Sequence, residues 1–124
     1  MAGELDFGEL NAVGCWEWRL HAYDGHTLRL IGGGDLVYSH VAELHLAGVS
    51  YLDCPVRMMH PVFRAATETE RSSVAQKVEV TRGTLILAIE AETTSSVDPL
   101  VFFIAAETAE LRRGLVRYAD PDRS

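Results

Sequence analysis

Lysine is almost absent from this sequence, since Lys77 is the single lysine among 11 basic residues, a bias typical of GC-rich bacterial genomes. Positive charge is scarce as a whole, because 18 acidic side chains leave a net charge of −7. Proteins that bind nucleic acid or anionic membranes gather Lys and Arg on one surface, so the sequence argues against both partners. The acidity favours either plain solubility or an acidic face that docks on a basic protein.

Cysteines and long apolar runs are scarce too. Cys15 and Cys54 are too few for a disulfide framework and lack the spacing of a zinc site. We expect two reduced thiols in or near the core, with a single disulfide as the alternative. No stretch approaches the roughly 18 consecutive apolar residues that a membrane helix requires. The first ten residues contain Glu4, Asp6 and Glu9 and no cationic segment, so we expect no signal peptide and, by default, a cytoplasmic protein.

What remains is a chain of 124 residues with 48% hydrophobic and 23% charged side chains. These values suit one domain with one core over residues 1–124. Short β-prone runs recur along the chain, separated by turn signals. The sequence therefore predicts a mainly β domain, an antiparallel sandwich or small open barrel of about seven strands with at most one short helix.

The clearest element is a hairpin over residues 15–33, with an Asp-Gly turn signal at residues 24–25. A two-residue loop would set leucines opposite polar residues. A three-residue loop instead pairs Leu20 with Leu28 and Trp18 with Leu30. We expect this second register, because a slip of one residue moves every side chain to the other face. It collects one apolar face: Trp16, Trp18, Leu20, Leu28 and Leu30.

Other segments follow by the same reasoning. Gly32-Gly33-Gly34 precedes neither a GK[ST] motif nor a helix, so it predicts a strand break with a tight turn or bulge rather than a phosphate loop. A helix is expected over residues 67–76, where Thr67 and Glu70 have capping-box spacing. Further strands are expected over residues 36–38, 41–52 with a bend at Gly48, 78–80, 84–92, 100–106 and 115–118, with an ordered crossing loop over 56–66 and a turn over 112–114.

Histidine is the residue type most suggestive of a site: the chain contains His21, His26, His40, His45 and His60. The segment from His40 to His45, which includes Glu43, is the leading candidate. Leu44 and Leu46 alternate with Glu43 and His45, as in a half-buried strand. We expect Glu43 and His45 to point to opposite faces unless a bulge intervenes. No two histidines are spaced two apart and there is no HExxH helix, so neither a metal nor a cofactor is expected.

Tyr23 and His26, beside the predicted turn, are the second candidates, because an exposed aromatic residue can anchor a contact. The predicted ligand-binding residues are thus His40, Glu43, His45, Tyr23 and His26. No catalytic residue is assigned. Each remaining candidate lacks the surrounding motif that its chemistry requires: Cys54 with His60, Ser39, Ser72 and Ser73, Glu90 with Glu92, and Glu107 with Glu110.

Two functions remain open from the sequence. The first is a non-enzymatic binding or protein-interaction module of the bacterial cytoplasm, in one version an immunity-like protein that neutralises a basic partner. The alternative is a small enzyme or small-ligand-binding β-barrel with an apolar pocket containing His and Glu. Pairing of edge strands into a homodimer is a third arrangement.

Overall fold

The computed structural model describes residues 5–34, 36, 39–93 and 96–118. The strand expected over residues 36–38 falls mostly outside them. In chain order the elements are α1 (Phe7–Ala12), β1 (Glu17–Tyr23), β2 (Thr27–Gly33), β3 (Ser39–Ala47), β4 (Tyr51–Asp53), β5 (Arg57–Ala65), α2 (Glu68–Ala75), β6 (Leu85–Thr93), β7 (Ser96–Ala106) and β8 (Thr108–Arg117).

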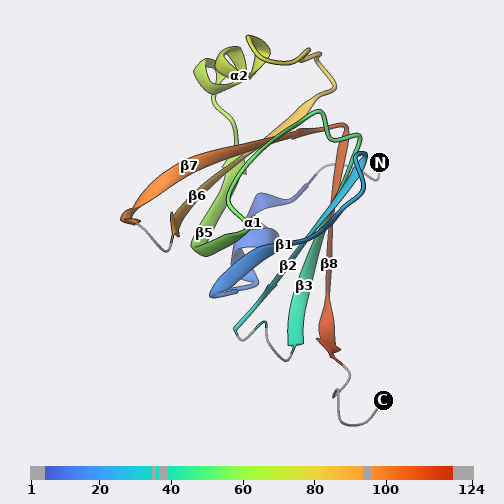
Figure 1. The fold of residues 1–124 in the computed structure, drawn as a ribbon, viewed down its shortest axis with the longest axis vertical. Coiled ribbons are helices and arrows are strands. Elements are labelled where there is room, and N and C mark those ends of the chain that lie inside the picture. The colour runs from blue at the N-terminus through green and yellow to red at the C-terminus, as the bar shows by residue number, and fades with distance from the viewer. Residues whose placement is uncertain (1–4, 35, 37–38, 94–95, 119–124) are drawn as a thin grey trace.

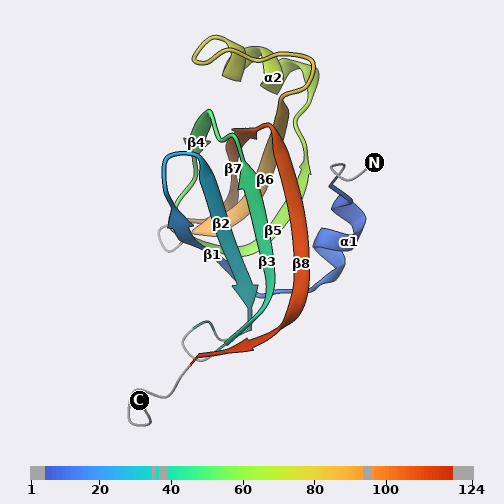
Figure 2. The ribbon, with the colours of Figure 1, turned by 90° about the vertical axis from the view of Figure 1, so that its right-hand side faces the viewer.

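The strands form one open antiparallel sheet in the order β4-β7-β6-β5-β1-β2-β3-β8. This sheet curls strongly. In Figure 1, β5, β6 and β7 run across the direction of β2, β3 and β8, and Figure 2 shows β1, β2, β3 and β8 as a separate layer. The mainly β, antiparallel fold predicted from the sequence is confirmed. Helix α2 is the predicted helix, and the six-residue helix α1 was not predicted.

The sheet changes direction at β5, which was expected to be a crossing loop. That expectation is wrong. The first part of β5 pairs with β1, for example Met59 with Glu17, and the second part pairs with β6, for example Val62 with Glu90. A register shift separates the two parts. Pro61 lies within it, and a bulge is one of the few places in a sheet that tolerate a residue without an N–H.

The hairpin of β1 and β2 forms, but in a different register from the predicted one. Leu20 pairs with Leu30 rather than with Leu28, and Trp18 pairs with Gly32 rather than with Leu30. The predicted core face is nevertheless correct for the four apolar residues, because the register differs by two residues and each side chain stays on the same face of the sheet. These residues are Trp18, Leu20, Leu28 and Leu30.

The turn explains the slip. The Asp24 carboxylate accepts hydrogen bonds from the backbone N–H groups of His26 and Thr27, and the Asp24 N–H donates to the Thr27 carbonyl. The loop is therefore longer than three residues, with Gly25 at a φ of 93° as the left-handed position. A register shift after Leu20 absorbs the difference.

The glycine run ends β2 instead of breaking it early. Gly32 and Gly33 belong to the strand. A Cβ on Gly32 would lie 2.5 Å from the Trp18 indole, so Trp18 packs into the space that only glycine leaves open. Trp16, which was expected on the core face, is exposed before β1 begins.

The two helices cover different parts of the sheet. Helix α1 places Leu10 in the main core, and the Asn11 side-chain amide bonds both the N–H and the carbonyl of Phe63 at 2.8 Å. These bonds satisfy backbone of β5 in the part where it no longer pairs with β1. Helix α2 packs Val74 against the outer side of β6 and β7, and its N-terminus has the capping box predicted for Thr67.

The C-terminal strands are longer than predicted. Strand β7 begins at Ser96 rather than at residue 100, and β8 begins at Thr108 rather than at residue 115. The turn expected over residues 112–114 is wrong, since these residues belong to β8, and Arg112 and Arg113 pair with β3. No strand forms over residues 78–80, which connect α2 to β6.

Candidate functional site

Polar side chains gather on the outer face of the layer formed by β1, β2, β3 and β8. Along each strand they alternate with core residues such as Leu30 and Leu44. The strand pairings align the outer residues in two rows. One row is Ala22, Arg29, His45 and Glu110, and the other is Arg19, Ile31, Glu43 and Arg112.

A continuous chain of hydrogen bonds joins four side chains on this face. The Tyr118 hydroxyl lies 2.8 Å from Nδ1 of His40, and Nε2 of His40 lies 2.7 Å from one carboxylate oxygen of Glu43. The second carboxylate oxygen lies 2.7 Å from Nε2 of His45. His40 is buried, and Glu43 exposes 19% of its side chain. We call these four residues the Glu43 network.

Hydrogen-bonding rules place the protons of the network. A carboxylate only accepts, so Nε2 of both histidines carries the hydrogen shared with Glu43. In a neutral His40, Nδ1 is then an acceptor, and the Tyr118 hydroxyl donates to it. All three bonds are therefore satisfied with neutral imidazoles. Nδ1 of His45 is left as a ring nitrogen with no hydrogen-bond partner in the described part of the chain.

Strand geometry explains how the network forms. Glu43 and His45 are two residues apart, so they share a face of β3. The expectation that they point to opposite faces is wrong, because alternation separates neighbours and not next-neighbours. His40 and Glu43 are three apart and would lie on opposite faces of a regular strand. A register shift between His40 and Ala42 interrupts the pairing of β3 with β8 and allows His40 to reach Glu43.

These contacts perturb the acid–base properties of the face. The hydrogen bond from His40, supported by that from His45, lowers the pKa of Glu43 to about 2 against the opposing effect of burial. The His21 ring lies 6.4 Å from the His40 ring. Burial lowers the pKa of His21, and the positive charge of Arg29 lowers it further. The outer face thus contains an ionised carboxylate at Glu43 and, near His21, a positive charge at Arg29.

A pocket of about 250 Å³ opens next to the network. Its lining residues are Ala22, Tyr23, Asp24, Thr27, Arg29 and His45. Arg29 is half-buried and forms no ion pair with any described residue, and its Nε atom is buried without a hydrogen-bond partner among them. Most buried polar atoms in proteins are satisfied, so Arg29 is the unusual member of this pocket.

The structure brings together most of the residues that the sequence singled out. His40, Glu43 and His45 form one network, and Tyr23 lines the pocket that His45 borders. His26 lies in the turn, where its backbone N–H bonds Asp24, and it does not line the pocket. Two residues were missed, Arg29 and Tyr118. Arg29 lies between Leu28 and Leu30 in the hairpin, so alternation puts it on the face opposite the apolar one, and this was the available signal. Tyr118 contacts His40 only in the folded sheet.

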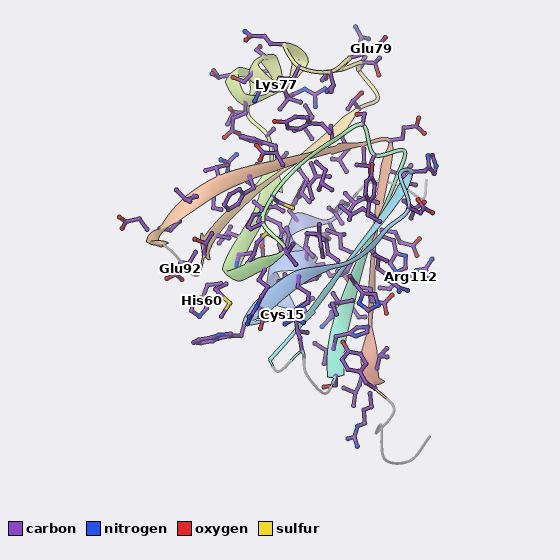
Figure 3. All side chains as sticks on the ribbon, viewed as in Figure 1. Cys15, His60, Lys77, Glu79, Glu92 and Arg112 are labelled. Atoms are coloured by element: carbon purple, nitrogen blue, oxygen red, sulfur yellow. The ribbon has the colours of Figure 1, made fainter. Side chains whose placement is uncertain are left out.

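A second, separate cluster surrounds His60. Its Nδ1 lies 2.6 Å from the Glu92 carboxylate, and its ring meets Trp16 edge-on at 4.0 Å between centroids. Figure 3 shows His60 beside Glu92, at the opposite margin of the molecule from Arg112. His60 has a φ of 49°, which places it in the left-handed region within the β5 bulge. This cluster does not extend to the Glu43 network.

The remaining candidates stay apart from both clusters. Cys15 and Cys54 are free and partly buried. Burial raises the pKa of both thiols, to about 12 for Cys54, which disfavours a thiolate nucleophile. Glu90 bonds Arg64, and Glu110 bonds Arg112. Within the described ranges, no group of three or more His, Cys, Asp or Glu side chains is arranged to hold a metal ion.

Comparison with known proteins adds no relatives: no family model, no curated protein and no solved structure matches the chain. Neither helix in the described residues has the length and apolarity that a membrane crossing requires. The geometry of the outer face is therefore the main guide to function.

Proposed function

We propose that this protein is a non-enzymatic binding module of the bacterial cytoplasm, and that it holds a small anionic group, a carboxylate or a phosphate, in the pocket beside Arg29 and His45. The observation that carries the proposal is the guanidinium of Arg29, which has no carboxylate partner among the described residues. The cytoplasmic location rests on the sequence alone.

The chemistry of arginine supports an anionic ligand. A guanidinium presents its donors in a planar fork that matches carboxylate and phosphate oxygens. A buried donor without a partner is destabilising by about 1–3 kcal/mol, and a bound anion would remove that penalty at Arg29. Two other arginines of this face are already paired with carboxylates: Arg19 bonds Glu17, and Arg112 bonds Glu110.

His45 supports a defined orientation for the ligand. Its bond to Glu43 fixes the ring and the position of its Nε2 hydrogen. Nδ1 is then available to accept a hydrogen bond from a protonated or hydroxyl-bearing ligand. Arg29 and His45 are directly paired across β2 and β3, so both can contact one small group. Two carboxylates weaken the electrostatic attraction of the pocket for an anion. Asp24 lines the pocket, and Glu110 of β8 lies opposite His45 in the strand register.

Size and exposure favour binding over catalysis. Ligand pockets of drug size span about 300–1,000 Å³, so a pocket of about 250 Å³ suits a small anion or the end of a larger molecule. Ala22, Tyr23 and Asp24 are exposed, so water reaches the site freely. The carboxylate and Nε2 atoms suited to proton transfer are occupied in the Glu43 network.

Titration calorimetry with inorganic phosphate and with acetate tests the proposal on the full chain. Arg29→Gln should weaken binding at least about tenfold, because a charge-assisted hydrogen bond contributes about 1.5–3 kcal/mol. Arg29→Lys keeps the positive charge but loses the planar arrangement of donors. Its affinity should therefore lie between those of wild type and Arg29→Gln. Arg82→Gln removes an exposed charge outside the pocket and should leave affinity unchanged.

Two outcomes would overturn the proposal. One is equal binding by wild type and Arg29→Gln, which would place any anion site elsewhere. The other is absence of binding to both anions. If the chain instead forms a salt-dependent complex with a basic protein, and Arg29→Gln does not change its affinity, the result would support the basic partner expected from the net charge of −7.

A further inference from the structure

Strand β8 forms one margin of the sheet. It pairs with β3 on one side, and no backbone hydrogen bond joins its other side to the part of the chain that the structure describes. The opposite margin, β4, is only three residues long, whereas β8 has ten residues. Figure 2 shows β8 at the edge of its layer, with α1 beside it.

Proteins usually protect long edges with prolines, lysines, bulges or covering elements. Within β8, the register shift opposite His40 and Ala42 and the unusual φ of Gly114 lie toward its C-terminal end. From Thr108 to Arg113 the ladder with β3 is uninterrupted. Helix α1 approaches through Glu9, 3.9 Å from Arg113, but it makes no backbone bond to the strand in the described residues. The regular half of β8 is therefore an accessible pairing edge.

We propose that this edge pairs with β8 of a second copy of the same chain, in an antiparallel arrangement centred on Leu111. The sequence around Leu111 supports this choice of partner. Glu110 and Arg112 flank it and share the outer face of the strand. In a two-fold symmetric pair centred on Leu111, Glu110 of each copy lies opposite Arg112 of the other, so two opposite-charge pairs form by symmetry.

Other registers are disfavoured by charge. Directly opposed residues in a sheet point to the same face, so the two-fold axis must pass through a residue of β8 and not between two. Centring on Glu110 or on Arg112 sets two like charges against each other. Centring on Arg113 opposes two arginines. Among these neighbouring registers, only the Leu111 centre is complementary, and a charge pattern of this kind recognises a copy of itself.

The arrangement leaves the proposed ligand pocket free. The pocket lies on the tip of β1 and β2 and on β3, whereas the pairing uses the far side of β8. Pairing over seven residues, from Thr108 to Gly114, is small for a protein interface. We therefore expect a reversible monomer–dimer equilibrium. This inference does not rest on the proposed function, and either can fail alone.

Sedimentation velocity over a range of protein concentrations tests the inference. Wild type should dimerise as the concentration rises. Glu110→Arg leaves positive charges facing positive charges, and Arg112→Glu leaves negative facing negative, so each should weaken the dimer at least about tenfold. Glu68→Arg changes an exposed charge in the first turn of α2, which packs on β6 and β7, and should behave as wild type.

Mixing the two variants tests this register specifically. Both variants lose the ion pair between Glu110 and Arg112 within one strand. A mixture of the two variants, however, restores opposite charges across the proposed interface and should form a heterodimer. Hydrogen exchange needs no variant: the amides of residues 108–114 should exchange more slowly at high wild-type concentration.

The inference is overturned by a wild type that stays monomeric at every concentration. It is equally overturned by a dimer that both single variants leave intact, or by a mixture that fails to associate. Circular dichroism on each variant establishes that it is folded. If either variant is unfolded, hydrogen exchange of the wild type decides alone. Amide exchange rates over residues 108–114 that do not change with protein concentration would overturn the inference.

Discussion

Replacement of Glu43 by glutamine probes the hydrogen-bonded network that organises the outer face. The carboxylate exposes 19% of its side chain and accepts a bond of 2.7 Å from each of His40 and His45. Its pKa is about 2 in the folded protein, against an ordinary value of 4.5. A difference of this size corresponds to at most about 3 kcal/mol of stability. Charge-assisted hydrogen bonds of about 1.5–3 kcal/mol each give the same order.

The dependence on pH follows from the lowered pKa of Glu43. A carboxyl group with a depressed folded-state pKa stabilises the protein above its unfolded pKa, and this contribution is lost as the pH falls through the folded value. The stabilisation is therefore present in full above pH 4.5 and disappears toward pH 2. At pH 3 about 1 kcal/mol should remain.

Urea unfolding followed by tryptophan fluorescence measures the effect. At pH 7, Glu43→Gln should lower the free energy of unfolding by about 2–3 kcal/mol, and at pH 3 the difference should shrink to about 1 kcal/mol. Glu79→Gln, at an exposed residue, is the matched control and should change it by less than about 0.5 kcal/mol. A loss for Glu43→Gln no larger than the control's, or the same loss at both pH values, would show that the ionised carboxylate does not stabilise the fold.

Three further substitutions test contacts of the fold by urea unfolding. Gly32→Ala should destabilise the protein by about 1–3 kcal/mol, because its Cβ meets an indole at 2.5 Å, whereas Gly34→Ala has nothing within 4 Å and should not. Asn11→Ala removes both bonds to the Phe63 backbone and should cost about 1–3 kcal/mol. Thr67→Ala removes the cap of α2 and should cost about 1 kcal/mol. An unchanged unfolding midpoint would contradict the close packing of Trp18 on Gly32, the Asn11 bonds to Phe63 or the Thr67 cap, according to the variant.

Alternation of apolar and polar residues was enough to predict the core faces of the central strands. Trp18, Leu28, Leu30, Leu44 and Leu46 all lie in the core, as their period of two requires. The exact register was not predictable from alternation. A slip of two residues keeps every face, so the choice depended on the Asp24 hydrogen bonds and on the bulge after Leu20, neither of which the pattern reveals.

The bend in β5 was not predictable because proline normally argues against a strand. Pro61 lies in the irregular part of β5, between the segments that pair with β1 and with β6. Only the folded sheet shows that this position needs no backbone N–H in a ladder. Helix α1 was not predicted because six residues are too few to show helical periodicity. Its position depends on the hydrogen bond from Asn11 to Phe63, a residue 52 positions further along the chain.

The candidate site was partly readable from sequence. The spacing of Glu43 and His45 implies a shared strand face, so strand periodicity alone is sufficient to place these two side chains together. The contribution of Tyr118, 78 residues from His40, had no local signal. Arg29 could be placed from its position between Leu28 and Leu30, because alternation sets it on the face opposite these leucines. Its lack of a partner, which makes it informative, is a property of the packed structure alone.

Chemical-shift mapping of the backbone amides during a phosphate titration is the decisive measurement for an anion site beside Arg29. Saturable shifts should concentrate at residues 22–29 and at His45, the segments that form the pocket, and they should be lost in Arg29→Gln. Shifts concentrated elsewhere on the sheet, or an unchanged spectrum at saturating phosphate, would contradict the proposed site.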